Sequence, residues 1–285
     1  MTKPLRLTPL FRERLWGREN LAPYFSETPQ GKRIGEVWFT CEENPDMCPL
    51  LIKLLFTAQR LSVQVHPGDE YAERRHRSLG KTEAWYVLDS QPPGELAVGF
   101  RETLTPERLK SASQSGEIAE LLAWRKVRSG DVIFVPAGTV HAIGAGLTIC
   151  EIQQNSDITY RLYDYGRPRD LHLEDAVSVS HLGECDSAPV PVALASWRDQ
   201  LLACKYFRME RLRPNKPIRI ERGLPCDVFL ICVKGSGAIA SQSFAAGHAW
   251  MVPAHCSEVE IEGPGSEWLA AYTADETTSA FQECS

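Results

Sequence analysis

Two polar side chains in the stretch 61–66 have a spacing that suits a metal ion. Gln64 and His66 are separated by one residue in Leu61-Ser62-Val63-Gln64-Val65-His66. Because side chains alternate between the two faces of a strand, Gln64 and His66 point to the same side. An amide oxygen and an imidazole nitrogen on one face can ligate one cation. A polar strand face in contact with water would show the same pattern, so both interpretations stay open.

A second histidine follows a proline and glycine turn. The pattern Gly130-x5-Pro136-x-Gly138-x2-His141 closes one strand and begins the next with the histidine. A turn of this kind directs His141 inward from a rigid scaffold, and four fixed positions of these types rarely coincide by chance. The motif therefore favours a ligand or catalytic group at His141 over a structural histidine, which stays the alternative.

Glu83 stands at the start of the otherwise apolar strand expected over 84–88. An unpaired carboxylate is costly there, so a cation is needed, either a metal ion or a nearby Lys or Arg. Together with Gln64, His66 and His141, Glu83 would complete a set of nitrogen and oxygen ligands. That set suits Zn²⁺, with Mn²⁺, Co²⁺, Fe²⁺ or Ni²⁺ as substitutes.

The elements that must position these residues are mostly β-strands. The 19 prolines and 20 glycines divide the chain into short runs rich in branched and aromatic residues. We expect strands over 61–66, 84–88, 131–135, 158–163 and 228–233. A threonine followed by proline at Thr105 and Pro106 predicts a helical excursion near 105–124.

The chain is expected to contain two domains, 1–183 and 197–285, joined by a linker rich in Pro, Ala and Ser within 184–196. A faint repeat supports two similar halves, because Gly130-Asp-Val-Ile-Phe-Val-Pro-Ala137 recurs as Gly247-His-Ala-Trp-Met-Val-Pro-Ala254. Convergent turn chemistry at the ends of two unrelated strands is the alternative.

The composition excludes several classes of protein. The apolar and charged fractions, 43% and 24%, are those of a folded globular chain. Thirty-seven acidic against 31 basic residues give a net charge of -6, which argues against nucleic acid and anionic membranes as partners. No leader pattern and no run of ~18 apolar residues is found, so we expect a cytoplasmic protein. The nine cysteines lack a C-x-x-C pair and are expected to be reduced thiols.

Four blocks of sequence, in this order, closely resemble the short bacterial class of type I mannose-6-phosphate isomerases. The resemblance extends from Pro9 to about Ala176, and more faintly through the C-terminal part. The blocks are Ser62-Val-Gln-Val-His-Pro-Gly-Asp-Glu-Tyr-Ala72, Gly80-Lys-Thr-Glu-Ala-Trp-Tyr86, Val135-Pro-Ala-Gly-Thr-Val-His-Ala-Ile143 and Gln153-Gln-Asn-Ser-Asp-Ile-Thr-Tyr-Arg-Leu-Tyr-Asp-Tyr165.

The resemblance implies two cupin domains, each a double-stranded β-helix jelly roll, of which the C-terminal one is degenerate. It implies one zinc ion per chain and a catalytic arginine at Arg161; the metal ligands would be Gln64, His66, Glu83 and His141. In the second half Glu258 falls where His141 sits. The chain departs from its relatives between Trp38 and Pro49, where about ten residues replace a few dozen.

The implied reaction is the interconversion of mannose 6-phosphate and fructose 6-phosphate, with a small-molecule sugar phosphate as the partner. Proton transfer between C1 and C2 builds negative charge on oxygen, which a metal and fixed cations stabilise. Arg161 would hold the phosphate or the developing charge, and Lys81 would provide a second cation or a proton relay. Asp157 would orient Arg161 or assist proton transfer. The alternative for Arg161 is an ion pair with Asp157 or Asp164, and for Lys81 a solvated position.

Two other functions fit parts of the pattern. Two histidines and a carboxylate also hold iron in metal-dependent cupin oxygenases, although Gln64 and the cations Arg161 and Lys81 speak against that chemistry. A catalytically silent cupin that binds a sugar phosphate is the other alternative, given the short segment after Trp38. The sequence sets no oligomeric state.

Overall fold

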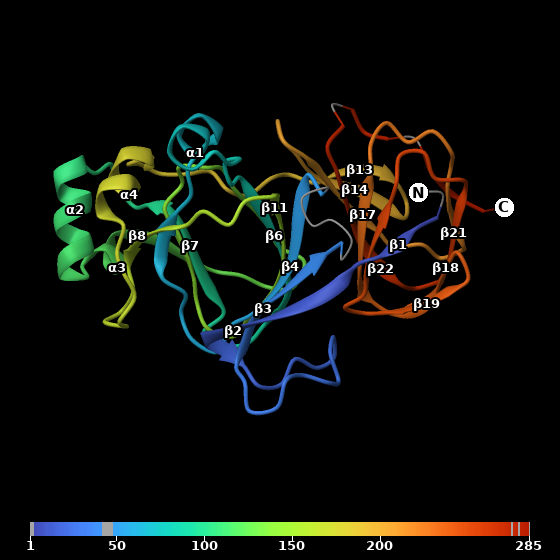
Figure 1. Ribbon diagram of the computed structural model, residues 1–285, viewed down its shortest axis with the longest axis horizontal. Coiled ribbons are helices and arrows are strands. Elements are labelled where there is room, and N and C mark those ends of the chain that lie inside the picture. Colours follow the sequence, from blue (N-terminus) through green and yellow to red (C-terminus); the bar gives the residue numbers. More distant parts are fainter. Residues whose placement is uncertain (1–2, 42–47, 275, 279, 285) are drawn as a thin grey trace.

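The computed structural model describes residues 3–41, 48–274, 276–278 and 280–284. In this part of the chain the strands form four sheets, and the four helices lie at one end of the molecule (Figure 1). The mostly β fold class expected from the sequence is confirmed. No helix of the described ranges is long and apolar enough to cross a membrane.

The N-terminal half builds two facing sheets, which we call the central sheet and the outer sheet. The central sheet has the order β2 (Thr8–Arg18), β3 (Ile34–Thr40), β4 (Leu50–Phe56), β11 (Leu147–Gln154), β6 (Glu83–Ser90) and β9 (Val132–Val135). The outer sheet has the order β12 (Tyr160–Tyr163), β5 (Val63–Val65), β10 (His141–Ile143), β7 (Glu95–Phe100) and β8 (Leu122–Lys126). Neighbouring strands are antiparallel, and six of the nine neighbouring pairs in these two sheets are not consecutive in the chain, as in a jelly roll.

The C-terminal half repeats this plan with two further sheets. One has the order β1 (Leu5–Arg6), β20 (Ala249–Val252), β17 (Val228–Lys234), β22 (Glu267–Tyr272), β15 (Arg208–Leu212), β14 (Arg198–Ala203) and β13 (Val192–Ala195). The other has the order β19 (Gln242–Ala245), β18 (Ser236–Ile239), β21 (Val259–Glu262), β16 (Ile218–Ile220) and β23 (Phe281–Glu283). Strand β1 comes from the N-terminus, so the N-terminal half contributes one strand to a sheet of the C-terminal half.

The halves also share one hydrophobic core, which explains the continuous apolar strands of the central sheet. Alternate residues of β4, such as Ile52 and Leu54, pack in one cluster with Phe229 and Met251 of the second half. Leu55, on the opposite face of β4, packs in the core cluster of the first jelly roll. Because both faces of β4 are covered, its sequence shows no polar alternation.

The helices lie beyond the outer sheet, away from the second half: α1 (Asp69–His76), α2 (Pro106–Ser115), α3 (Ile118–Leu121) and α4 (Leu173–Val179) (Figure 1). The expected threonine cap is present, since the Thr105 hydroxyl accepts the backbone N–H of Arg108 at 3.2 Å. The expected helical stretch near 105–124 ends at Leu121, because residues 122–126 form β8 and pair with β7.

Two other sequence predictions need correction. The strand expected over 61–66 is limited to Val63–Val65. The stretch 184–196, expected to be a linker, contains β13, which pairs through its backbone with β14 as an edge strand while its side chains are exposed. Backbone pairing of this kind leaves no apolar periodicity in the sequence, so the pattern gave no sign of it.

The internal repeat corresponds to two equivalent strands. Gly130 and Gly247 have φ angles of 93° and 88°, a region in which glycine is favoured, and each is followed by a four-residue strand, β9 or β20. Glu258, at the position equivalent to His141, pairs with Arg219 at 3.2 Å and is about half exposed. The domain boundaries 1–183 and 197–285 stay a prediction.

Candidate metal centre

Strand register brings three predicted site residues into one row of the outer sheet. Gln64 on β5 is the direct antiparallel partner of His141 on one side and of Arg161 on the other. Directly opposed residues of antiparallel strands point to the same face, so all three side chains emerge on one side of the sheet. His66 lies two residues after Gln64 and shares this face. Glu83 faces them from the first position of β6 in the central sheet.

His66, Glu83 and His141 converge between the two sheets. The Glu83 Oε2 atom lies 3.5 Å from His66 Nε2, and Glu83 Oε1 lies 3.5 Å from His141 Nε2. One ligand atom from each of the three residues lies within 4.8 Å of the others, and all three residues are buried. The amide nitrogen of Gln64 is 3.2 Å from His141 Nε2. Rotating this amide by half a turn would place its oxygen at the cluster.

Backbone hydrogen bonds orient both imidazoles. His66 Nδ1 lies 2.9 Å from the carbonyl oxygen of Ile158, and His141 Nδ1 lies 2.9 Å from that of Thr139. A carbonyl can only accept, so each Nδ1 carries the proton and each Nε2 presents a lone pair to the cluster. Second contacts of this kind are typical of histidines that ligate metals.

Burial perturbs all three groups. It lowers the pKa of His66 well below its usual value and that of His141 to about 4, and the nearby Lys81 ammonium lowers both further. Burial and the Glu151 carboxylate raise the pKa of Glu83 to about 8, against the opposing effect of Lys81. Both imidazoles are therefore neutral near pH 7, the form in which they ligate metals.

The cluster contains buried polar atoms that have no hydrogen-bond partner in the surrounding described residues. Among the described residues, His66 Nε2 and both carboxylate oxygens of Glu83 are buried without a hydrogen-bond partner. Lys81 is itself buried, so it is not a solvated lysine, and its Nζ lies 3.6 Å from Glu83 Oε2. This contact leaves His66 Nε2 without a donor, whereas His141 Nε2 faces the amide nitrogen of Gln64. A divalent cation would satisfy the converging nitrogen and oxygen atoms together, so the residues fit a bound metal.

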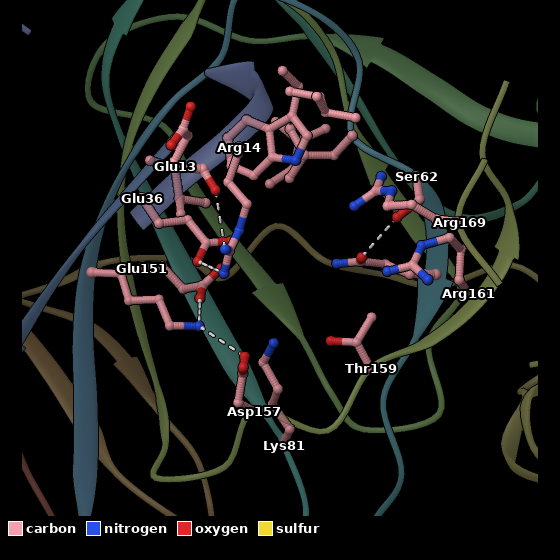
Figure 2. Close-up of a pocket in the computed structure, with 17 residues that line it drawn as sticks. Glu13, Arg14, Glu36, Ser62, Lys81, Glu151, Asp157, Thr159, Arg161 and Arg169 are labelled. Carbon is pink, nitrogen blue, oxygen red and sulfur yellow. Dashed lines mark hydrogen bonds and ion pairs between the residues drawn. The ribbon is translucent and has the colours of Figure 1, made fainter. Parts of the chain in front are cut away.

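A pocket of about 490 Å³ lies beside the cluster, and two residues that contact the cluster, Gln64 and Lys81, line it. Figure 2 shows that the two walls of this pocket differ in charge. On one wall each cation is paired with an acid: Lys53 Nζ lies 3.0 Å from Glu151 and Arg14 Nη2 lies 2.8 Å from Glu36. The other wall, called the arginine wall below, carries Arg161, Arg169, Ser62 and Thr159.

Arg161 is held by its own segment of chain and not by Asp157. Its Nη1 donates to the backbone carbonyl of Asp170 at 2.8 Å, and its backbone N–H donates to His172 Nδ1 at 3.1 Å. The carboxylate of Asp157 instead lies 3.9 Å from Lys53 Nζ and is more than half exposed. The expected orientation of Arg161 by Asp157 is therefore not seen. Asp164, the other expected partner, is bound by Arg167 and Arg169.

The sequence reasoning missed Lys53 and Glu151, which face each other across β4 and β11. Both are buried, and Lys53 also donates to Gln153 Oε1 at 2.6 Å. Burial lowers the pKa of Lys53, but the carboxylates of Glu151 and Glu36 outweigh it and raise the pKa above its usual value. A signal was present: each is the single charged residue of an apolar strand, Leu50–Phe56 for Lys53 and Leu147–Gln154 for Glu151.

Known proteins resemble this chain in sequence. No family model matches it. Mannose-6-phosphate isomerase ManA of Bacillus subtilis is 34% identical over 92% of this chain and 96% of its own length. The mannose-6-phosphate isomerase of Streptococcus mutans is 29% identical over 79% of this chain and 83% of its own. The alignment with ManA spans 312 positions against 285 residues in this chain, so this chain lacks segments of its relative. The shortened stretch between Trp38 and Pro49 falls largely in 42–47, outside the described residues.

Solved structures agree with these relatives. The mannose 6-phosphate isomerase from Bacillus subtilis superposes with a TM-score of 0.85 at 26% identity, covering 95% of this chain and all of that one. A phosphomannose isomerase variant from Salmonella typhimurium gives a TM-score of 0.75 at 16% identity, which supports the fold alone. The predicted cupin fold and the resemblance in sequence are both confirmed. The chain belongs to the mannose-6-phosphate isomerase family.

Proposed function

We propose that this chain interconverts mannose 6-phosphate and fructose 6-phosphate in the pocket above His66, Glu83 and His141. One observation carries the proposal: the ligand atoms of these three residues converge in a buried position beside a polar pocket, and those of His66 and Glu83 have no hydrogen-bond partner among the described residues. The pocket also has a wall that carries Arg161 and Arg169 and, among the described residues, no carboxylate, which suits a phosphorylated sugar. The oxygenase and the silent binding protein lack a comparable observation in their favour.

The bound cation is proposed to be one Zn²⁺ per chain, held by Gln64, His66, Glu83 and His141. Two imidazoles, a carboxylate and an amide oxygen are borderline-hard ligands of the kind that zinc accepts in tetrahedral sites. When bound, such a cation polarises sugar oxygens and stabilises negative charge that develops on them. The Nδ1 bonds of His66 and His141 keep both Nε2 lone pairs directed at that position.

The remaining residues are proposed to handle charge and protons. Arg161 presents a guanidinium to the negative charge of the substrate, and Lys81, buried beside Glu83, supplies a second cation or relays a proton. Lys53 and Glu151 line the opposite wall, where the Glu151 carboxylate can accept a proton from one sugar carbon and return it to the next, with the Lys53 ammonium as a donor to the sugar oxygens. Asp157, at the rim beside Lys53, can assist that transfer.

We also propose that residues 1–183 act as the catalytic domain and 197–285 as a degenerate cupin that supports it. Figure 1 shows the second half packed beside the central sheet, on the side away from the helices. The shared core and the pairing of β1 with β20 tie the second half to the scaffold that carries the candidate metal centre. A cytoplasmic location stays a prediction.

A coupled assay on purified protein tests the function. Protein stripped with a chelator and reloaded with one equivalent of Zn²⁺ should convert mannose 6-phosphate to fructose 6-phosphate, and stripped protein should not. Oxygen consumption without isomerisation would support the oxygenase. Binding of mannose 6-phosphate without turnover by the reloaded protein would support the silent cupin and contradict the proposal.

A further inference from the structure

Three arginines and one buried aspartate form a compact cluster that includes the two arginines of the arginine wall. Asp164 is only 2% exposed and accepts two bonds of 2.6 Å from Nε and Nη2 of Arg169. Arg167 Nη2 lies 2.7 Å from the same carboxylate. Arg161 joins from β12. The three guanidinium groups and one carboxylate leave the cluster two positive charges in excess.

Arg161 and Arg169 are the members of the cluster that face the pocket. Both line it, and Figure 2 shows their guanidinium groups side by side above Thr159. Arg161 Nε is buried without a hydrogen-bond partner among the described residues. Burial and the charge of Arg169 lower the pKa of Arg161 from its usual value, and the carboxylates of Asp164 and Asp170 offset this only in part. An anion between the two would relieve both effects.

Asp164 holds Arg169 in an orientation that leaves one guanidinium nitrogen available to a ligand. Its Nε and Nη2 are used by Asp164, so Nη1 remains to contact a ligand in the pocket. Arg167 is arranged differently: it donates to the carbonyl oxygens of Asp164 and Arg60, lies over the ring of Tyr165, and does not line the pocket.

The opposite wall is a poor place for an anion. Its Lys53 and Arg14 are already paired with Glu151 and Glu36, and Glu13 adds a further acid. A dianion placed there would meet carboxylates and no free guanidinium, and like charges at close range are strongly unfavourable.

We propose that Arg161 and Arg169 together bind the phosphate group of the sugar phosphate, with Asp164 as the positioning residue that holds Arg169 toward it. The inference rests on the proposed function and fixes the direction of the substrate. With the phosphate on the arginine wall, the sugar extends across the metal centre and its reacting carbons approach Lys53 and Glu151. Two guanidinium groups match the geometry and charge of a phosphate dianion.

Binding of inorganic phosphate to the zinc-loaded full chain tests this directly by titration calorimetry. Charge-assisted hydrogen bonds contribute enough that Arg169→Ala should weaken phosphate binding about 10- to 100-fold and raise the KM for mannose 6-phosphate similarly. Arg169→Lys keeps the positive charge but loses the planar pair of guanidinium N–H donors. Its phosphate affinity and KM should therefore lie between those of the parent protein and those of Arg169→Ala. The matched control Arg167→Ala removes one charge from the same cluster and should change both quantities by less than about threefold, the effect of a screened charge outside the pocket.

Zinc content and kcat distinguish a loss of phosphate binding from a general loss of folded structure. Arg169→Ala should retain full zinc content and a kcat within a few-fold of the parent protein at saturating substrate. An unchanged KM and phosphate affinity in Arg169→Ala would overturn the inference, as would a loss of kcat or zinc with KM unchanged. Phosphate binding that depends on Arg169 in a protein without isomerase activity would uphold this inference while the proposed function fails.

Discussion

The buried pair of Lys53 and Glu151 gives a prediction whose size follows from its environment. The two side chains are 2% and 6% exposed and lie 3.0 Å apart, with Lys53 Nζ also 4.7 Å from the centre of the Trp38 ring. Lys53→Met keeps the length of the side chain and removes its charge. Among the described residues, the indole N–H of Trp85, at 3.2 Å, is then the one hydrogen-bond donor left to the buried Glu151.

Loss of one partner from a buried ion pair costs about 3–5 kcal/mol, because the remaining charge is uncompensated. Lys53→Met should therefore lower the free energy of unfolding by about that amount. The double variant Lys53→Met/Glu151→Leu removes both charges and should recover at least about 2 kcal/mol of the loss. Both variants should lose isomerase activity, because each lacks a group proposed to take part in proton transfer. The double variant restores the packing but not these groups.

Urea unfolding of zinc-free protein, followed by tryptophan fluorescence, measures these differences. A matched control is Arg128→Met, which breaks an exposed pair with Asp131 (3.6 Å, Arg128 90% exposed) and should change stability by at most about 0.5 kcal/mol. The reasoning is refuted if Lys53→Met is as stable as the control, or if the double variant is no more stable than the single one. Full activity in Lys53→Met would show that the pair has no part in proton transfer.

Three other substitutions separate metal binding, substrate binding and scaffold. His141→Ala removes a proposed ligand, so the variant should lose its zinc and retain less than about a hundredth of the parent turnover rate. Elemental analysis measures the zinc, and an active variant would contradict the role of His141. Arg161→Ala should keep its zinc, because Arg161 lies outside the proposed ligand set. It should lose turnover in the coupled assay, because the Arg161 side chain faces the pocket. Loss of zinc would instead assign Arg161 to the metal site. Thr105→Ala removes the N-terminal cap of α2. It should lower the midpoint of urea unfolding by the equivalent of about 1 kcal/mol without changing the isomerase rate. An unchanged midpoint would show that the cap does not contribute to stability.

Much of the metal centre could be predicted from local rules. Alternation on a strand placed Gln64 and His66 on one face, and a proline and glycine turn directed His141 inward. Glu83 stood out because an acid begins an apolar strand. The structure brings His66, Glu83 and His141 together with Gln64 beside them, although the residues lie up to 77 positions apart.

The rest of the pocket depended on facts that no local pattern contains. Lys53 and Glu151 lie in strands that are buried on both faces, so periodicity could not tell which side chains point inward. Arg161 is held by the backbone carbonyl of Asp170, and a carbonyl has no residue type to recognise in a sequence. The pairing of β1 with β20 likewise depends on a tertiary register between the two ends of the chain.

The central claim is that one divalent ion joins the imidazoles of His66 and His141, the carboxylate of Glu83 and the amide oxygen of Gln64. Anomalous diffraction at the zinc absorption edge, from crystals of the active protein, tests this claim most directly. A single peak about 2.0–2.2 Å from both Nε2 atoms and from oxygens of Glu83 and Gln64 is predicted. A fully active protein whose only bound metal lies elsewhere, or which holds no metal, would contradict it.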